Sequence, residues 1–191
     1  MSGSSVLKRL ATLAVVLSAG GIAALATTRA TPTWYQTLKK PWFDPPEWLF
    51  GPAWMTLYLL MAVAAFLVWK QGIGMPGVKL ALAVFLVQLV LNALWSVFFF
   101  GLRSPLAGLV DIIVLWLAIL ATIILFLRIS VPAGVLLLPY LGWVSFAAAL
   151  NAAIHVLNRW EGSGRDGPHL SPAGLYPPAT SSKIRNLGVI L

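Results

Sequence analysis

Long stretches without charged residues constrain the fold of this chain more than any other feature. Only 9% of its 191 residues are charged and 60% are hydrophobic, a composition far outside that of soluble domains. An apolar helix needs about 20 residues to cross a hydrocarbon core of ~30 Å. Runs close to that length lie at 10–28, 48–69, 80–102, 104–127 and 129–158, with Asp111 as the one charged residue inside them. Because barrel strands would alternate apolar and polar residues, we predict an all-α membrane protein, a compact bundle of five transmembrane helices.

The predicted membrane domain covers residues 1–160. Its spans are expected at about 10–28, 50–69, 79–100, 105–127 and 132–158. The last three connections are short, so consecutive helices should be antiparallel neighbours. Residues 161–191 are rich in Gly, Pro and Ser and are predicted to be a disordered tail. The first run has a second interpretation as a cleaved signal peptide, because Lys8 and Arg9 precede it and small residues follow near Ala26; we favour its retention as a span.

The net charge of +8 does not indicate a nucleic-acid partner, because the basic residues are scattered among predicted helix ends and form no stripe for a phosphate backbone. They fit a membrane topology better. With five spans, the long first loop and the C-terminus share the side that carries more Lys and Arg. The positive-inside rule then predicts that this side is cytoplasmic.

Sequence signals for common enzyme chemistry are missing. The chain has no cysteine, no Ser/His/Asp set, no paired intramembrane carboxylates and no phosphate-binding loop. We expect no metal site, no required cofactor and no ordinary hydrolase or redox enzyme. For His155 a hydrogen bond is favoured over haem ligation. For Asp111 we favour snorkelling, interaction with the helix N-terminus or pairing with Arg103 over a proton or ligand role.

The first long loop, residues 29–49, combines aromatic residues with several prolines. It is too hydrophobic for an ordinary connection and too interrupted by proline for one long helix. We predict that it forms a lid over the bundle at the membrane surface. The residues expected at the lid or mouth are Arg29, Trp34, Tyr35, Lys39, Lys40 and Trp42.

Polar and aromatic residues recur at helical spacing inside three predicted spans. The strips are Trp54, Tyr58 and Met61; Gln88, Asn92 and Ser96; and Trp143, Ala147, Asn151 and His155. Amides are costly against lipid, so these strips should face inward. Interhelical hydrogen bonds of roughly 0.6 kcal/mol each are one explanation, which we favour for Gln88 and Ser96. The other is a pocket for a planar apolar ligand, which we favour for Trp54, Asn92, Trp95 and Trp143.

Several motifs, in order along the chain, resemble one known family. They are Trp34, Tyr35, Leu38, Lys40, Pro41, Pro45, Pro46, Trp48, Gly51, Pro52, Trp54, Leu57 and Tyr58; then Gln88, Asn92, Trp95 and Phe98 to Gly101; and finally Pro139, Tyr140, Trp143, Phe146, Ala147, Leu150 and Asn151. Together they resemble the tryptophan-rich sensory protein or translocator protein family, TspO/MBR. The likeness runs from about Gly20 to Asn158 and covers all five predicted spans.

This resemblance implies a five-helix membrane protein, often dimeric, that binds porphyrins and synthetic ligands in a cavity beneath the first loop. The positions that match the family's pocket are Trp54, Asn92, Trp95, Trp143 and Ala147, with Tyr35 and Tyr58 at or near the loop and cavity. With neighbours on the same faces, the predicted ligand-binding set is Trp54, Tyr58, Asn92, Trp95, Trp143, Phe146, Ala147 and Leu150. Some members are linked to light-dependent porphyrin breakdown, which would involve Trp54 and Trp143. The cholesterol motif of animal members lacks its tyrosine here, where Ala152 stands, so a bacterial tetrapyrrole-sensing member fits better.

We therefore predict an integral, multi-pass membrane receptor for a tetrapyrrole, such as protoporphyrin IX or a haem-like molecule. Its partners would be the lipid bilayer, the porphyrin or another planar apolar small molecule, and a second copy in a homodimer. The ligand would stack on the tryptophans, with its propionates reaching Arg29, Lys39 or Lys40. A porphyrin transporter or exporter and a light-dependent porphyrin-degrading protein are the alternatives.

Overall fold

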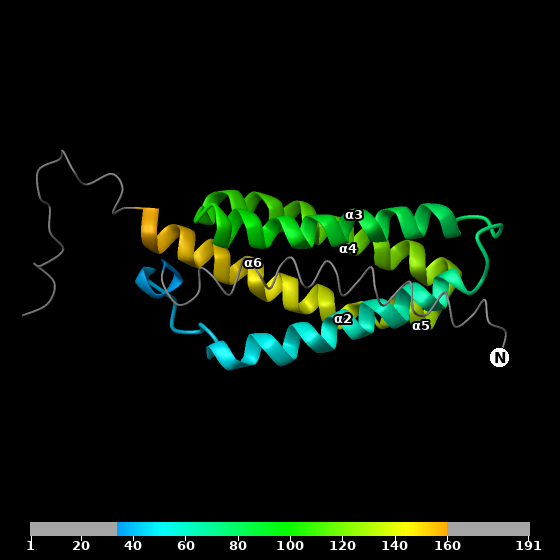
Figure 1. Cartoon of the computed structure of the whole chain (residues 1–191), viewed down its shortest axis with the longest axis horizontal. Helices are drawn as coiled ribbons and strands as arrows, with labels where there is room; N and C mark the ends of the chain where they lie inside the picture. The colour runs from blue at the N-terminus through cyan, green and yellow to red at the C-terminus, as the bar shows by residue number, and fades with distance from the viewer. Residues whose placement is uncertain (1–33, 160–191) are drawn as a thin grey trace, which may run out of the picture.

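The computed structural model describes residues 34–159, and all regular structure in that range is helical (Figure 1). The long helices are α2 (Glu47–Trp69), α3 (Val78–Ser96), α4 (Pro105–Ile129) and α6 (Leu138–Arg159); a π-helical turn, η2 (Val97–Gly101), continues α3, and the short α5 (Val131–Val135) precedes α6. Four stretches in this range are long and apolar enough to cross a membrane: Glu47–Trp69, Val78–Gly101, Pro105–Ile129 and Val131–Arg159. The predicted first span at 10–28, Arg29 and the predicted tail at 161–191 lie outside the described residues.

Prolines and glycines set the helix boundaries close to where the sequence predicts them. Pro46 precedes α2 in an extended conformation, and Gly77 precedes α3 with a φ of 85°, a value that favours glycine. Pro105 begins α4, and the Ser104 hydroxyl accepts a hydrogen bond from the backbone N–H of Ala107 at 3.2 Å. This is an N-cap, which satisfies one of the unpaired donors at a helix start.

The predicted last span at 132–158 is not one continuous helix. The structure divides it into α5 and α6, with a turn at 136–137 between them. Proline explains the division, because Pro132 and Pro139 each lie in a first helical turn, where the missing N–H costs no hydrogen bond. The combined stretch Val131–Arg159 is still long and apolar enough to cross a membrane.

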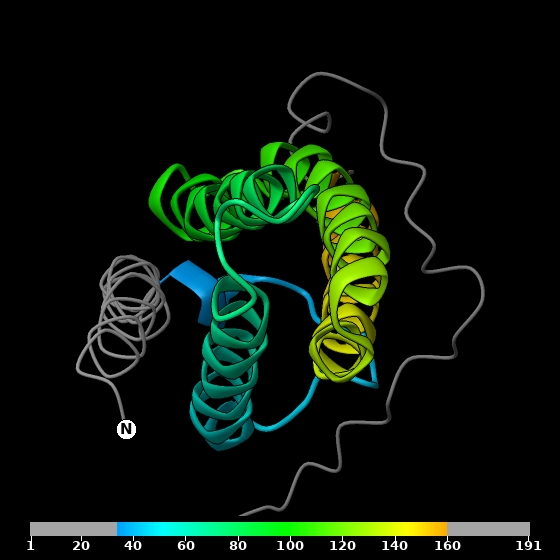
Figure 2. The same cartoon turned by 90° about the vertical axis from the view of Figure 1, so that its right-hand side faces the viewer.

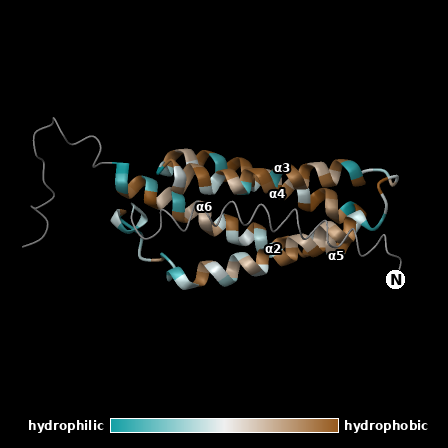
Figure 3. Ribbon diagram, viewed as in Figure 1, coloured by the Kyte–Doolittle hydropathy of each residue, from teal (hydrophilic) through white to brown (hydrophobic). Residues whose placement is uncertain are grey.

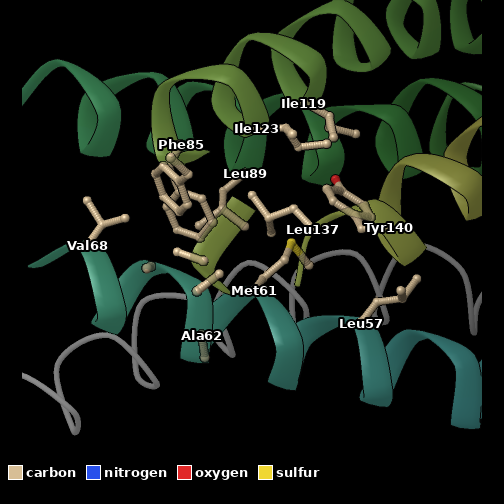
Figure 4. Packing of buried hydrophobic residues seen from close by; sticks show 14 of the residues in the cluster. Leu57, Met61, Ala62, Val68, Phe85, Leu89, Ile119, Ile123, Leu137 and Tyr140 are labelled. Carbon is tan, nitrogen blue, oxygen red and sulfur yellow. The ribbon is translucent and has the colours of Figure 1, made fainter. Parts of the chain in front are cut away.

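The core lies where α4 packs between α3 and α6, while α2 approaches the bundle through α3 and α5 (Figure 2). Figure 4 shows Met61 of α2, Phe85 of α3 and Tyr140 of α6 among the buried side chains that fill this region. The rings of Phe85 and Phe126 stack at 5.7 Å between α3 and α4. Helices in lipid associate through such packing and through hydrogen bonds rather than through the hydrophobic effect.

The outer surface of the helices is strongly apolar. Figure 3 shows hydrophobic residues along the helices and hydrophilic ones mainly toward their ends. Exposed leucine, valine and isoleucine side chains line the outside of α3 and α4; examples are Leu86, Val90, Ile113 and Leu117. An apolar surface of this extent needs lipid around it. The chain is therefore a membrane protein whose bundle sits in a bilayer.

Candidate functional site

The lid segment, residues 34–46, lies over the end of the bundle where α6 finishes (Figure 1). Tyr35 is buried there, with ring centroids 6.3 Å from Phe99 and 5.7 Å from Phe100. Its hydroxyl donates to Asp44 Oδ1 at 3.0 Å. Burial, together with the negative charge of Asp44, raises the pKa of the Tyr35 phenol well above its usual range. The phenol therefore stays protonated and keeps donating to Asp44.

Lys40 completes this arrangement. Its Nζ lies 3.7 Å from Asp44 Oδ2 and 4.2 Å from the centre of the Tyr35 ring. The ammonium thus has a carboxylate and an aromatic face as partners, and each favours a cation. Tyr35, Lys40 and Asp44 therefore stabilise one another within the lid segment.

Hydrogen bonds and apolar contacts join the lid segment to α6. The backbone N–H of Lys39 donates to Asn158 Oδ1 at 3.0 Å, and Asn158 Nδ2 donates back to the Lys39 carbonyl at 3.0 Å. Further along the lid segment, the rings of Phe43 and Phe146 meet edge to face at 6.3 Å. Trp42 points away, with 95% of its surface exposed, so this predicted lid residue does not cover the bundle.

An apolar groove of about 450 Å³ separates the first half of α2 from the first half of α6. Its lining residues are Pro52, Ala53, Thr56 and Leu57 of α2 and Pro139, Gly142, Trp143 and Phe146 of α6. The groove exists because α2 packs mainly against α3 and α5 and has little direct backbone contact with α6. Phe50 closes part of the gap, with its ring 6.0 Å from that of Trp143. A volume of this size is within the usual range for small-molecule sites.

The predicted polar ligand-binding residues are already hydrogen-bonded to one another inside the bundle. Tyr58 OH donates to Asn92 Oδ1 at 2.8 Å, and Asn92 Nδ2 donates to Tyr140 OH at 3.0 Å. Tyr140 OH then donates to Gln88 Oε1 at 3.0 Å. All four side chains are buried. This chain of bonds ties α2, α3 and α6 together, as buried polar groups in a membrane require.

Trp54 and Trp95 line the wall of this interior rather than the groove. The Trp54 ring stacks on Tyr58 at 5.6 Å. The Trp95 ring stacks on Phe99 at 5.4 Å, and its indole N–H donates to Asn151 Oδ1 at 3.2 Å. Each ring is thus fixed by partners within the bundle.

The structure therefore divides the predicted ligand-binding set into two groups. Trp143 and Phe146 line the groove. The others lie in or against the packed interior and do not line the groove; they are Trp54, Tyr58, Asn92, Trp95, Ala147 and Leu150. Sequence reasoning left out the other groove residues, Pro52, Ala53, Thr56, Leu57, Pro139 and Gly142. A usable signal was present, because Pro139, Gly142 and Phe146 recur at three- and four-residue steps and so share one helix face.

Asp111 and His155, which lie within the predicted spans, have different surroundings. Asp111 is buried, with 6% of its surface exposed, so the expectation that it snorkels to the interface is wrong. Within residues 34–159 its Oδ2 has no hydrogen-bond partner, and no ion pair joins it to Arg103. His155 lies on α6 and is half-buried. Neither residue lines the groove.

Comparisons with known proteins agree on one family. The TspO/MBR family profile matches residues 11–157. The tryptophan-rich protein TspO of Archaeoglobus fulgidus is 48% identical over 155 residues, which cover 81% of this chain and 99% of that protein. Protein CrtK of Rhodobacter capsulatus is 42% identical over 130 residues, covering 67% and 80%. The translocator protein of Homo sapiens is 38% identical over 134 residues, covering 69% and 79%.

Proposed function

Because the chain belongs to the TspO/MBR family, we propose that it is a membrane receptor that binds a porphyrin in the groove between α2 and α6. The observation that carries this proposal is the groove itself. It combines about 450 Å³ of volume with two aromatic side chains, Trp143 and Phe146, and lies beside the lid segment. A flat apolar ring system needs such a slot, with apolar walls and aromatic faces.

The residues of the proposed site have different roles. Trp143 and Phe146 contact the ligand directly, and Gly142 leaves room for it. The predicted residues behind the groove, such as Trp54, Tyr58, Asn92 and Trp95, hold the wall in place through their bonds and ring contacts. An amide from this wall reaches the ligand only if it exchanges a tyrosine partner for a ligand atom. The wall is thus expected to affect affinity less than the groove residues do.

The propionates of a porphyrin would lie at the lid end of the groove. Lys39, Lys40 and Arg29 are the cations that we assign to this mouth. Lys40 already has Asp44 as a partner at 3.7 Å, so a propionate would compete with that carboxylate. Because propionates and cations would pair at an exposed mouth, the affinity should fall as salt increases.

We also propose a span number, an orientation and a dimer for the whole chain. The family profile begins at residue 11, at the predicted first span, which supports five spans rather than a cleaved leader. We further propose that the loop at 29–49 and the C-terminus are cytoplasmic, and that two copies associate. Signalling then requires the ligand to bind one arrangement of the lid segment or dimer better than another, because equal affinity for both would shift nothing.

The decisive experiment measures protoporphyrin IX binding to the detergent-solubilised protein, first in darkness and then under illumination with product analysis. A receptor binds saturably in the dark and leaves the porphyrin intact. Light-driven loss of many porphyrins per protein would instead support the degrading function. Failure to bind in the dark would overturn the proposed function.

A further inference from the structure

Three basic side chains gather at the end of the bundle opposite the lid segment, where Figure 1 shows the α2–α3 link beside α5 and the end of α4. Lys70 follows the last residue of α2, Lys79 is the second residue of α3, and Arg128 is next to last in α4. All three side chains are exposed, and within residues 34–159 none of them forms an ion pair. Each therefore lies at the end of a membrane-spanning helix with its charge turned outward.

The packing of α3 against α4 brings two of these cations to the same level. The rings of Phe85 and Phe126 stack at 5.7 Å. Lys79 lies six residues before Phe85, about 9 Å along α3, and Arg128 lies two residues after Phe126, about 3 Å along α4. Because the two helices run in opposite directions (Figure 1), both steps lead toward the same end. The short link places Lys70 at that end as well.

The two ends of the bundle differ in how their cations are neutralised. At the lid end, Lys40 lies 3.7 Å from Asp44, and Glu47 begins α2. The third acidic residue among the described ones is Asp111, which is buried inside α4. The described part of the chain thus supplies no carboxylate to the opposite end. Its positive charges create a potential that attracts anions from outside the protein.

Helix stability explains two of the three cations but not the third. Lys70 and Arg128 lie at helix C-termini, where the helix macrodipole favours positive charge. Lys79 lies in the first turn of α3, where the macrodipole disfavours it. A cation that costs the helix stability at this position is better explained by an anion that it binds.

The α2–α3 link itself, residues 70–77, presents apolar side chains beside these charges. Ile73 and Met75 are exposed. They are held on hydrogen-bonded turns, in which the Gly72 N–H donates to the Trp69 carbonyl at 3.0 Å and the Met75 N–H donates to the Gly72 carbonyl at 3.1 Å. The exposed Leu80 of α3 joins this apolar tip to the outer surface that faces lipid. Apolar side chains next to cations are typical of surfaces that lie in the lipid headgroup layer.

We propose that this end of the bundle binds the headgroups of anionic phospholipids. Lys70, Lys79 and Arg128 contact the lipid phosphates and neutralise their charge. Ile73 and Met75 lie beside them, at the level of the first acyl carbons. The partner is a lipid rather than a soluble anion, because the basic surface is continuous with the lipid-facing side of α3 and its tip is apolar.

The test places a fluorophore on the link through Gly74→Cys, because the chain has no cysteine and a Cβ at position 74 meets nothing within 4 Å. The labelled full chain is reconstituted in phosphatidylcholine vesicles that contain a minority of phosphatidylglycerol. Bromine atoms on the chains of one lipid or the other quench the fluorophore, so the two quenching curves give the local preference between the lipids. The labelled protein should prefer phosphatidylglycerol about fivefold or more, and the preference should fall as salt increases.

Substitution of the cations should remove this preference. Lys79→Gln should lower it roughly 2- to 5-fold, since one basic residue near a lipid surface contributes about 1 kcal/mol, or fivefold. Substituting Lys70, Lys79 and Arg128 together by Gln should bring the two quenching curves close to equality. Lys79→Arg keeps the charge and should keep the preference. Arg103→Gln is the matched control, because it removes an exposed cation at the lid end and should leave the preference at position 74 unchanged.

Equal quenching by the two lipids in the labelled protein would overturn the proposal. A preference that survives the triple substitution in folded protein would also overturn it. If the triple variant does not fold, a preference that responds neither to salt nor to Lys79→Gln has the same meaning. Inorganic phosphate is compared with chloride at equal ionic strength: an equal loss supports the lipid site, and a larger loss with phosphate would indicate a site for soluble phosphate instead. No porphyrin is present, so the result is independent of the groove.

Discussion

Two faces of α6 differ in how completely neighbouring groups fill the space around them. On the inner face, Tyr140 bonds to Asn92 and Gln88, and Asn151 accepts from Trp95. On the face toward α2, Gly142 and Trp143 border about 450 Å³ of groove. A polar interior whose groups are all hydrogen-bonded makes a helix bundle rigid. Open apolar volume can instead bind an apolar ligand. We therefore infer that the inner face of α6 stabilises the fold and that the face toward α2 binds the ligand.

The space around two glycines shows the same difference in packing. A Cβ at Gly108, against the inner face, would lie 2.9 Å from Asn151 Oδ1 and 3.0 Å from Phe99 Cβ. A Cβ at Gly142 would meet nothing within 4 Å. The inner face therefore has no room for a methyl group, and the groove has room for one or more.

The largest effect is expected at Trp143, the largest side chain on the groove. Trp143→Ala should weaken protoporphyrin binding roughly 5- to 150-fold, which corresponds to about 1 to 3 kcal/mol for a lost aromatic contact and its buried area. Trp143→Phe should weaken it less. Trp69→Phe, at the far end of α2, is the control and should bind normally. Equal affinity of folded Trp143→Ala and wild type would place the ligand elsewhere.

Filling the groove from Gly142 should have the next largest effect. Gly142→Leu adds a side chain to open volume, so the protein should fold normally while protoporphyrin affinity falls by about tenfold or more. Gly142→Ala separates volume from backbone effects, because it removes the glycine and fills little space. Titration of both variants, with thermal unfolding as the folding check, measures this. A stable Gly142→Leu protein with normal affinity would show that the groove is not the site.

The opposite result is expected at Gly108. Gly108→Ala should lower the stability of the bundle by roughly 1 to 3 kcal/mol, because the new methyl group overlaps Asn151 and Phe99 in a packed region. Its ligand affinity, measured in the protein that remains folded, should change little. Thermal unfolding in detergent gives the first quantity. Unchanged stability would mean that the inner face is looser than its contacts indicate.

The smallest effect is expected in the pH dependence of stability, through Tyr35 of the lid segment. Its phenol has a raised pKa in the folded protein, so above the ordinary tyrosine pKa of about 10 the unfolded chain loses the proton first. The stabilisation is therefore complete below about pH 10 and is lost as the pH rises above it. Wild type should lose stability relative to Tyr35→Phe as the pH rises above about 10. The difference in phenolate absorbance between the two proteins should show ionisation of Tyr35 above the ordinary value; ionisation at or below it would contradict the buried Tyr35–Asp44 bond.

Much of the described fold follows from the sequence, because charge-free runs and prolines mark the ends of membrane helices directly. The α2 helix begins at Glu47 against a predicted start near residue 50, and α4 begins at Pro105 as predicted. The predicted span at 132–158 did not include the division between α5 and α6. Pro132 and Pro139 signal a bend, but a bend and a break carry the same sequence signal.

The site was harder to predict. Helical spacing shows which residues share a helix face, but it does not show which groups lie opposite that face. Asn92 and Tyr58 share inward faces, yet they bond to each other at 2.8 Å rather than point into open space. The groove depends on α2 separating from α6, which no local pattern encodes. Asn158 lay at the edge of the family resemblance, and its partner is the backbone of Lys39, which has no sequence signature.

The most direct test of the account uses the absence of cysteine from the chain. Gly142→Cys places a single thiol in the groove, and Gly74→Cys places one in the distant link between α2 and α3, where a Cβ also meets nothing within 4 Å. The rate of labelling by a small uncharged thiol reagent is measured for both proteins, with and without saturating protoporphyrin IX in darkness. The account predicts that the ligand slows labelling at position 142 at least about tenfold, as expected for a site that buries most of its ligand, and leaves position 74 unaffected. Equal labelling of position 142 with and without bound porphyrin would contradict the assignment of the groove as the binding site.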